Sequence, residues 1–346
     1  MTLPPRMRAL LLNDDGYSSK SSGALLEDMG SYVTLGDIEV PEPGPSQVLV
    51  KVSVAAINPS DVMFVKGLYG QPRQKGQPAG FEGVGTVVAA GAEPAAQRLV
   101  GQRIAFPTGR SNWGSWAEYA IAEAAACIPL MDGVKDTDGA AMIVNPLTAL
   151  AMFGIVKEEG EKAFVLTAAA SQLCKLLMGA AREEGYRPIA IVRRDDQIPL
   201  LEAAGAAHVL NTTAPDFADK LAKVMKAEQP RIFLDAVTGP LAGQIFAAMP
   251  KRARWIIYGR LDPETTPIPE PGQMIFMHKR VEGFWLTEWL RASPPERRVE
   301  VVKEAQKRFI DGRWSTDVTA VVPLEEAVAK VPGELAKPNG KVFITP

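Results

Sequence analysis

Hydrophobic positions follow two different rhythms along the chain of 346 residues. In the first third, short runs rich in β-branched residues are separated by glycine and proline, as in 47–57 (QVLVKVSVAAI) and 83–91 (GVGTVVAAG). Such runs are typical of short strands joined by turns. We therefore expect this part of the chain to form an antiparallel, partly barrel-like β domain.

From about residue 145 onward, apolar runs of strand length alternate with helix-like segments. This alternation predicts parallel strands joined by right-handed crossovers, which is the α/β class with a doubly wound sheet. The expected strands are KAFVLTA (162–168), PIAIVRR (188–194), HVLNT (208–212), RIFLDAV (231–237) and RWIIYG (254–259). The expected helices are 171–184, 198–204, 216–227 and 241–248.

A further helix is predicted over residues 295–312 (PERRVEVVKEAQKRFIDG). Its periodicity puts Val299, Val302 and Phe309 near one face, and Gly312 is the expected stop. The Lys and Arg residues of this helix are expected on its solvated side.

The last residues, NGKVFITP (339–346), predict one more strand, which we expect to return to the first domain. The chain length also suits two domains with a sizeable interior. The expected domains are therefore 1–144 together with 315–346, and 145–314.

Composition narrows the classes of partner. The 38 Lys and Arg residues nearly balance the 40 Asp and Glu residues. The overall charge therefore gives no electrostatic attraction to nucleic acid or to an anionic membrane. The apolar runs are shorter than the roughly 20 residues that a membrane span requires, and the N-terminus lacks a signal-peptide layout. Two unpaired cysteines, Cys127 and Cys174, fit a reducing compartment. We expect a cytoplasmic protein whose partners are small molecules.

Metal chemistry is not expected. A catalytic zinc takes about three Cys, His or acidic ligands, and a structural zinc takes four. The chain offers His208 and His278 besides its two separated cysteines. Both histidines are expected in structural or solvent-facing positions, so a zinc mechanism is not expected.

The segment 165–185 (VLTAAASQLCKLLMGAAREEG) lies where a nucleotide-binding fold places its phosphate turn, yet it holds no glycine before Gly179. Phosphate binding at such a turn depends on backbone N–H groups and on the helix dipole. The small residues Ala168, Ala169, Ala170 and Ser171 are compatible with that task, and Ser171 is a suitable N-cap. From this pattern alone, a nucleotide site and a plain strand–turn–helix remain equal alternatives.

The end of the next predicted strand favours a nucleotide. Arg193 lies about 20 residues beyond Ser171, with Arg194 beside it. Arginine at this position suits the extra phosphate of NADP, whereas an acidic residue suits the ribose of NAD. NADPH is therefore favoured over NADH, although a strand that ended one or two residues later would put Asp195 in the acidic position.

With these motifs assembled, the chain resembles the zinc-independent medium-chain dehydrogenase/reductase superfamily, in its quinone oxidoreductase branch. Within that branch it is most similar to the mitochondrial-type trans-2-enoyl-thioester reductases, on the strength of GLYG together with GFWLTEW. The resemblance implies a Rossmann domain that binds NADPH, a GroES-like catalytic domain and a homodimer. It rests on AAINPSD (55–61), GLYG (67–70), GFEGVGTVVAAG (80–91), NPLTAL (145–150), the turn above, IVRR (191–194), GAAHVLN (205–211), YG (258–259), GFWLTEW (283–289) and GKV (340–342).

Two departures accompany the resemblance. Zinc-using relatives carry a histidine where this chain has Phe81, which leaves Glu82 without a metal. The usual Gly-Gly-x-Gly of quinone reductases is replaced by Ser171, Gln172, Leu173 and Cys174.

The resemblance also implies roles for individual residues. Tyr69 matches the catalytic tyrosine, which gives a proton or a hydrogen bond to the thioester, and a phenol is protonated at neutral pH. Asn58 and Thr148 match positions near the nicotinamide and the substrate. The implied cofactor contacts are Ser171, Gln172, Leu173, Arg193, Arg194, Tyr258, Gly259, Phe284, Trp285, Leu286 and Lys341.

The expected function is NADPH-dependent reduction of an activated C=C bond, with an enoyl thioester as the favoured substrate. One alternative is reduction of quinones or other small electrophiles, in which Tyr69 has no essential role. An alternative of another class is a cofactor-binding sensor or partner-binding protein without turnover. The retained Tyr69, Asn58 and Thr148 argue against this last alternative, and the glycine-free turn argues for it.

Overall fold

The chain divides into two units, one formed by residues 1–144 and 304–346 and the other by residues 145–303. The structure, a computed structural model, describes residues 3–19, 23–108, 113–337 and 340–346. The boundary at 303/304 falls inside a helix, whereas we had expected it after that helix, at 314/315. The reason is that the last turns of this helix belong to the first unit: the buried carboxamide of Gln306 accepts the N–H of Met131 at 2.7 Å.

The second unit is built on a six-stranded parallel sheet in the order β10-β9-β8-β11-β12-β13. All four residues of β8 and of β11 are buried, as expected for central strands covered on both faces. The predicted α/β class and doubly wound sheet are confirmed. The strands are β8 (Ala163–Leu166), β9 (Arg187–Val192), β10 (His208–Asn211), β11 (Ile232–Asp235), β12 (Arg254–Ile257) and β13 (Arg280–Gly283).

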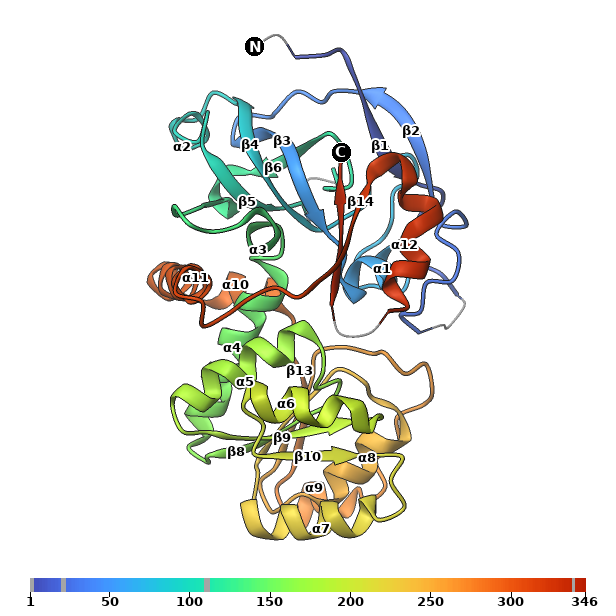
Figure 1. The fold of residues 1–346 in the computed structure, drawn as a ribbon, viewed down its shortest axis with the longest axis vertical. Coiled ribbons are helices and arrows are strands. Elements are labelled where there is room, and N and C mark those ends of the chain that lie inside the picture. The colour runs from blue at the N-terminus through green and yellow to red at the C-terminus, as the bar shows by residue number, and fades with distance from the viewer. Residues whose placement is uncertain (1–2, 20–22, 109–112, 338–339) are drawn as a thin grey trace. The chain divides into compact units, whose positions relative to one another are not determined.

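Helices cover both faces of this sheet. Figure 1 shows α5 and α6 on one side of the strands and α7 on the other, and α5 packs on α6 as α7 packs on α8. The chain order reverses direction between β8 and β11, which is where doubly wound folds bind ligands. The helices are α4 (Val144–Glu159), α5 (Gln172–Glu183), α6 (Ile198–Ala204), α7 (Phe217–Glu228), α8 (Gly239–Ala248), α9 (Gly272–Phe276), α10 (Leu286–Ala292) and α11 (Pro295–Ile310).

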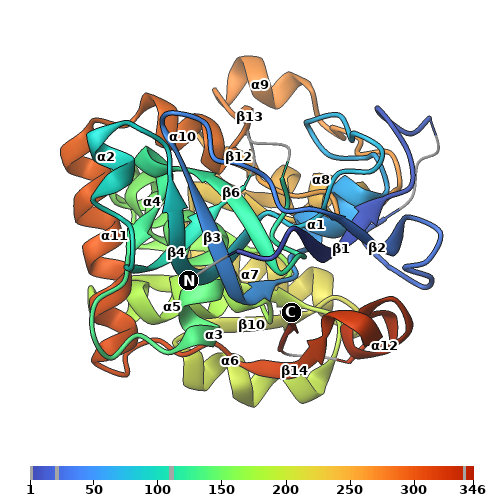
Figure 2. The same ribbon diagram turned by 90° about the horizontal axis from the view of Figure 1, so that it is seen from above.

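The first unit contains a mainly antiparallel sheet in the order β14-β15-β3-β4-β5-β7, with β6 also paired to β3. The C-terminal strand lies between β14 and β3, so the predicted return of the last residues to the first domain is confirmed. Figure 2 shows β3, β4 and β6 side by side in the body of this sheet. The strands are β1 (Arg6–Leu12), β2 (Val33–Glu39), β3 (Gln47–Ala56), β4 (Glu82–Ala90), β5 (Arg103–Pro107), β6 (Tyr119–Glu123), β7 (Ile128–Pro129), β14 (Val318–Pro323) and β15 (Lys341–Thr345).

Strands β1 and β2 form a separate antiparallel pair, and the helices of the first unit are short. They are α1 (Pro59–Val65), α2 (Pro94–Gln97), α3 (Asp136–Ala140) and α12 (Ala327–Leu335). Residues of β3, α1, β5, β15 and α12 share one buried apolar core, which fixes the start of α1 against the sheet. Within the described ranges, no helix is long and apolar enough to cross a membrane.

The predicted inner face of α11 was partly wrong. Val299 is 51% exposed, whereas Val301 and Phe309 are buried. The face that is covered is set by the residues that α11 meets, and the local periodicity of the sequence does not contain that information.

Candidate cofactor and substrate sites

The predicted phosphate turn connects β8 to α5 without a glycine. Ala168 adopts φ +47°, a left-handed conformation in which glycine is the usual residue. Ser171 is the N-cap of α5, and its hydroxyl accepts the N–H of Cys174 at 3.3 Å. The turn therefore has the backbone geometry of a glycine turn while using alanine and a serine cap.

A buried polar pair anchors this turn. The Thr167 hydroxyl donates to the fully buried carboxylate of Asp235 at the end of β11 and accepts the N–H of Ala236 at 3.0 Å. The other Asp235 oxygen accepts the indole N–H of Trp255 at 2.9 Å. These bonds tie β8 to β11 where the chain order reverses. This pair was not predicted from the sequence, in which the one signal for it is an aspartate at the end of an otherwise apolar run.

Tyr258 lies behind the turn. Its hydroxyl is 3.4 Å from the Cys174 sulfur in the first turn of α5. Burial raises the pKa of Tyr258 well above its usual value, and the neighbouring Cys174 adds to this. Burial also raises the pKa of the Cys174 thiol, which therefore stays protonated and unreactive. The Cys174 thiol also donates to the Thr167 carbonyl at 3.6 Å, so it links Tyr258 to the start of the turn.

The two candidate arginines stand directly after β9. The strand ends at Val192, and Arg193 and Arg194 are both exposed. Arg194 pairs with Asp196 at 3.1 Å. Asp195 accepts the side-chain N–H of Asn211 at 2.8 Å. Because β9 ends at Val192, Arg193 and not Asp195 is the residue that directly follows the strand.

The other candidate residues of the second unit lie in four places. Thr148 is buried in α4, and Gln172 and Leu173 are buried in the first turn of α5. Gly259 follows β12, where an added Cβ would come within 2.9 Å of the carbonyl oxygen of Ala236. The segment after β13 holds the half-buried Phe284, Trp285 as the 38% exposed N-cap of α10, and Leu286 as its first residue.

Tyr69 is held in the first unit by an aromatic stack. The chain leaves α1 through Gly67 at φ +73°, where an added Cβ would collide with the Arg73 guanidinium. The half-buried Tyr69 ring then packs on Phe81, with centroids 5.0 Å apart and planes tilted by 44°. Phe81 in turn packs on Phe64 at 4.9 Å.

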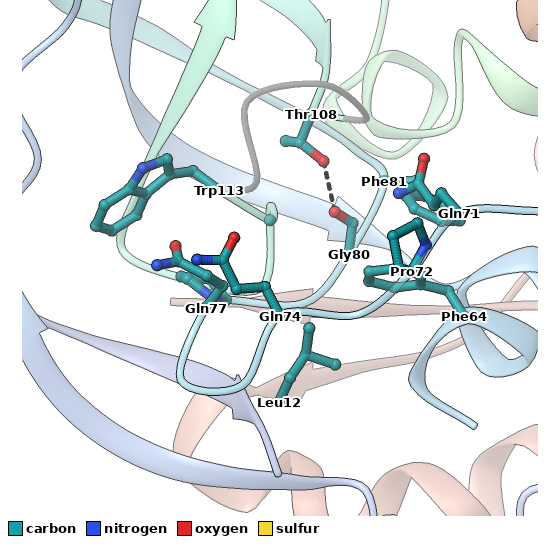
Figure 3. Close-up of a pocket in the computed structure, with 12 residues that line it drawn as sticks. Leu12, Phe64, Gln71, Pro72, Gln74, Gln77, Gly80, Phe81, Thr108 and Trp113 are labelled. Carbon is teal, nitrogen blue, oxygen red and sulfur yellow. Dashed lines mark hydrogen bonds between the residues drawn. The ribbon is translucent and has the colours of Figure 1, made fainter. Parts of the chain in front are cut away.

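Phe81, on which the Tyr69 ring packs, also lines a pocket of the first unit. Figure 3 shows Trp113 on one side of this pocket and Phe81, Pro72 and Phe64 on the other, with the hydrogen bond from Thr108 to Gly80 between them. The described lining contains no charged side chain. Among the described residues, the buried Gln77 Oε1 has no hydrogen-bond partner. The full lining is Leu12, Phe64, Gln71, Pro72, Gln74, Gln77, Pro78, Gly80, Phe81, Thr108, Trp113 and Gly114.

A buried polar cluster lies beneath Phe81. It consists of Asn58, Asp61, Glu82 and Lys341, which are each at most 6% exposed. The Lys341 ammonium donates to Asn58 Oδ1 at 2.6 Å, and Asn58 Nδ2 donates to Glu82 Oε1 at 2.8 Å. Asp61 accepts the N–H of Asn58 and the N–H of Phe81, both at 2.7 Å. Lys341 is thus directed into the interior of the first unit. The predicted cofactor contact would instead require its ammonium at the rim of a site.

Burial shifts the ionisation of this cluster. It raises the pKa of Asp61 to about 7 and also raises the pKa of Glu82. It lowers the pKa of Lys341, while the two carboxylates act in the opposite direction.

The sequence and the fold match known proteins. Residues 44–132 match the alcohol dehydrogenase GroES-like domain, and residues 168–305 match the zinc-binding dehydrogenase family. A crystal structure from Mesorhizobium loti, of a protein provisionally named an NADPH:quinone reductase, has 71% sequence identity and a TM-score of 0.98, with 100% of each chain covered. The chain belongs to the quinone oxidoreductase branch of the medium-chain dehydrogenase/reductase superfamily.

Members of this superfamily named as enoyl reductases are also similar to the chain. The mitochondrial enoyl-[acyl-carrier-protein] reductase of Bos taurus is 25% identical over 328 residues, which cover 93% of this chain and 84% of the relative. An enoyl thioester reductase of Candida tropicalis, solved in a mutant form, shares the fold with a TM-score of 0.78 at 19% identity, covering 99% of this chain and 100% of its own. The expected family membership is confirmed.

The name of the second matching family implies a bound zinc ion. The residues that the structure describes in this chain do not form a zinc site. The phenyl ring of Phe81 has no atom that binds a metal. Both Glu82 oxygens are engaged, one by Asn58 and the other by the N–H groups of Ile143 and Val144 at 3.0 and 2.9 Å. Within the part of the chain that the structure describes, no three His, Cys, Asp or Glu side chains gather as a metal site would require.

Proposed function

We propose that the protein uses NADPH to reduce an activated C=C bond, with a 2-enoyl thioester as its preferred substrate. The observation that carries this proposal is Tyr69, whose ring packs on Phe81 in the lining of a pocket that has no charged side chain among its described residues. Similarity to proteins named enoyl reductases over nearly the whole chain supports the same substrate class.

The second unit is proposed to hold the cofactor. The first N–H groups of a helix have no partners within the helix and favour an anion, so the start of α5 at Gln172 and Leu173 suits the pyrophosphate. Exposed Arg193 and Arg194 beside the end of β9 suit the additional phosphate of NADPH. We assign Thr148, Gly259 and the segment 284–286 to the nicotinamide side of this site on the family resemblance.

The first unit is proposed to supply the acid. Bound NADPH provides the hydride for Cβ of the substrate, and a proton must reach Cα. The Tyr69 hydroxyl can donate that proton or hydrogen-bond the thioester oxygen as negative charge develops there. The pocket lined by Phe81 has no charged lining residue in the described chain, and its volume of about 20 Å³ requires the lining to move before an acyl group can enter.

Quinone reduction is the second candidate function. It is supported by the 71% identity to the Mesorhizobium loti protein with that provisional name. A quinone is a neutral ring that can pack on aromatic side chains such as Phe81 and Trp113, and its reduction would not require Tyr69 as an acid. A sensor without turnover is the third candidate, and the glycine-free turn remains its one argument.

The experiment that tests these candidates is NADPH oxidation measured side by side with crotonyl-CoA and with 1,4-benzoquinone. Faster turnover of crotonyl-CoA, lost in Tyr69→Phe, is the expected result. Quinone turnover that does not depend on Tyr69 would establish the second candidate, and tight NADPH binding with neither activity would establish the third.

We also propose a homodimer formed through the edge strand β13. Exposed apolar side chains gather in and beside this strand: Ile275 (66% exposed), Phe276 (79%), Val281 (39%) and Trp285 (38%). An unpaired edge with apolar neighbours favours pairing with a second copy. Light scattering should give a dimer mass, and Val281→Lys should shift it toward the monomer.

The cytoplasm is the proposed location, since the cysteines of the described chain are free thiols.

A further inference from the structure

We propose that Lys341 is a positioning residue whose ammonium acts as an internal cation, holding Asn58, Asp61 and Glu82 and through them the placement of Phe81 against Tyr69. This inference goes beyond the proposed function, and only its activity measurement depends on that function. It follows from the geometry of the first unit, where the starts of α1, β4 and β15 bring these four side chains together.

The chemistry of the donors fixes one arrangement of the cluster. An ammonium can only donate, so Lys341 requires the oxygen of the Asn58 amide. The amide nitrogen therefore faces Glu82, whose ionised carboxylate has no proton to donate and only accepts. Lys341 also donates to the carbonyl of Ile57 at 3.3 Å. A change at Lys341 therefore removes one of the two contacts that fix which way the Asn58 amide faces, the other being the contact with Glu82.

Charge balance gives Lys341 a second task. The charged groups that face Asp61 are Glu82 from β4 and Lys341 from β15. Two buried carboxylates and one buried ammonium leave an excess negative charge if all three are ionised, and an unpaired buried charge is costly. Without Lys341, the carboxyl groups would retain protons to higher pH.

The cluster reaches the candidate acid through Phe81. Asp61 accepts the Phe81 N–H at 2.7 Å, and the Phe81 ring packs on Tyr69. An ionised Asp61 accepts this N–H more strongly than a neutral one. The protonation of the cluster, which Lys341 controls, therefore affects how firmly Phe81 and Tyr69 are held.

The test compares the wild type with Lys341→Met, Lys341→Arg and Asp61→Asn by urea unfolding between pH 5 and pH 8. The folded pKa of Asp61, about 7, lies above its ordinary value of 3.8. Asp61 therefore contributes stability that is fully present below its unfolded pKa and is lost as pH rises through the folded pKa. We expect wild-type stability to fall toward pH 7 relative to Asp61→Asn, which lacks this group. In Lys341→Met, the pH at which this loss of stability is complete should be higher than in the wild type by about one unit or more. In Lys341→Arg, that pH should return to the wild-type value.

Identical pH profiles for Lys341→Met and the wild type would overturn the proposal, as would a Lys341→Arg protein that behaves like Lys341→Met. NADPH affinity separates this role from the cofactor contact predicted by the sequence: Lys341→Met should bind NADPH as the wild type does, and a tenfold loss of affinity would refute the positioning role.

Activity provides a second measurement. In the pH profile of kcat with crotonyl-CoA, the change near pH 7 should shift to higher pH in Lys341→Met, as the unfolding profile does. In Lys341→Arg it should return to the wild-type pH. KM for NADPH should stay unchanged in both variants. A kcat limb that stays in place while the unfolding profile moves would refute the link to Tyr69. If the wild type reduces neither enoyl thioester nor quinone, the proposed function fails, and the unfolding series still decides the role of Lys341.

Discussion

The ring of Tyr69 packs on the ring of Phe81, whose own N–H is held by the buried carboxylate of Asp61. The candidate acid is therefore positioned by its ring and by the backbone beside it. A substitution that keeps the ring and removes the hydroxyl should leave this packing in place, which makes the hydroxyl testable by itself.

Tyr69→Phe should lower kcat for crotonyl-CoA by about 10²-fold or more, because one general acid typically contributes 10²–10⁴-fold. NADPH affinity should remain unchanged, since the cofactor site is proposed in the other unit. Steady-state kinetics and a fluorescence titration of NADPH would check the two statements. Tyr17→Phe is the matched control, because Tyr17 is 61% exposed in the same unit. Unchanged kcat in Tyr69→Phe would remove the hydroxyl from the mechanism.

Arg193→Gln should weaken NADPH binding by about tenfold or more and leave NADH binding nearly unchanged. The reason is that a guanidinium hydrogen-bonds to and neutralises a phosphate that NADH lacks. Isothermal titration with both cofactors gives the ratio of affinities. Lys223→Gln removes the same charge from an exposed position on α7 and should affect neither cofactor. An equal loss for NADH and NADPH would place Arg193 away from the additional phosphate.

Ala168→Gly should raise the free energy of unfolding by about 1 kcal/mol, because glycine adopts the left-handed conformation at φ +47° without the cost that alanine carries. The neighbouring Ala169→Gly is the contrast, since Ala169 is fully buried and its methyl group packs in the interior. That variant should lose about 1 kcal/mol. Chemical denaturation of the two proteins measures both effects. A destabilised Ala168→Gly protein would show that the turn is not strained.

Gln77→Leu should distinguish substrates with a hydrogen-bond donor from those without one. The buried Gln77 Oε1 has no partner among the described residues, so a ligand N–H or O–H would satisfy it once the side chain turns toward the pocket that it lines. We expect kcat/KM to fall about fivefold for crotonyl-pantetheine, which carries amide N–H groups, and to stay level for the S-ethyl thioester of crotonic acid. Gln71→Leu, in the same pocket, is the control. Equal effects of the two variants would indicate general polarity of the pocket instead.

The parts of the fold that depend on local pattern were predictable from the sequence. The helix predicted over 198–204 has those limits in the structure, and the one predicted over 171–184 begins one residue later because Ser171 is its cap. Alternating strands and helices, together with the order of the family motifs, were sufficient for the doubly wound sheet.

The predictions failed or stopped short where a side chain depends on a distant partner. Lys341 and Asn58 are 283 residues apart in sequence, so no local pattern shows that the lysine is directed inward. The same holds for Asp235, whose partner Thr167 comes from another strand. Nor does the sequence AAAS reveal that Ala168 takes the conformation of a glycine.

The position of β15 in the middle of the first sheet has a consequence for how the protein is made. β3 is synthesised early, but one of its neighbours in the sheet, β15, is formed by residues 341–345. Until β15 has been made, the end of β3 at Ala55 and Ala56 lacks this partner and Asn58 lacks its lysine, although the second unit can already fold. The first unit is therefore completed only after the second unit has been synthesised, and a truncation before residue 341 would remove an inner strand of its sheet.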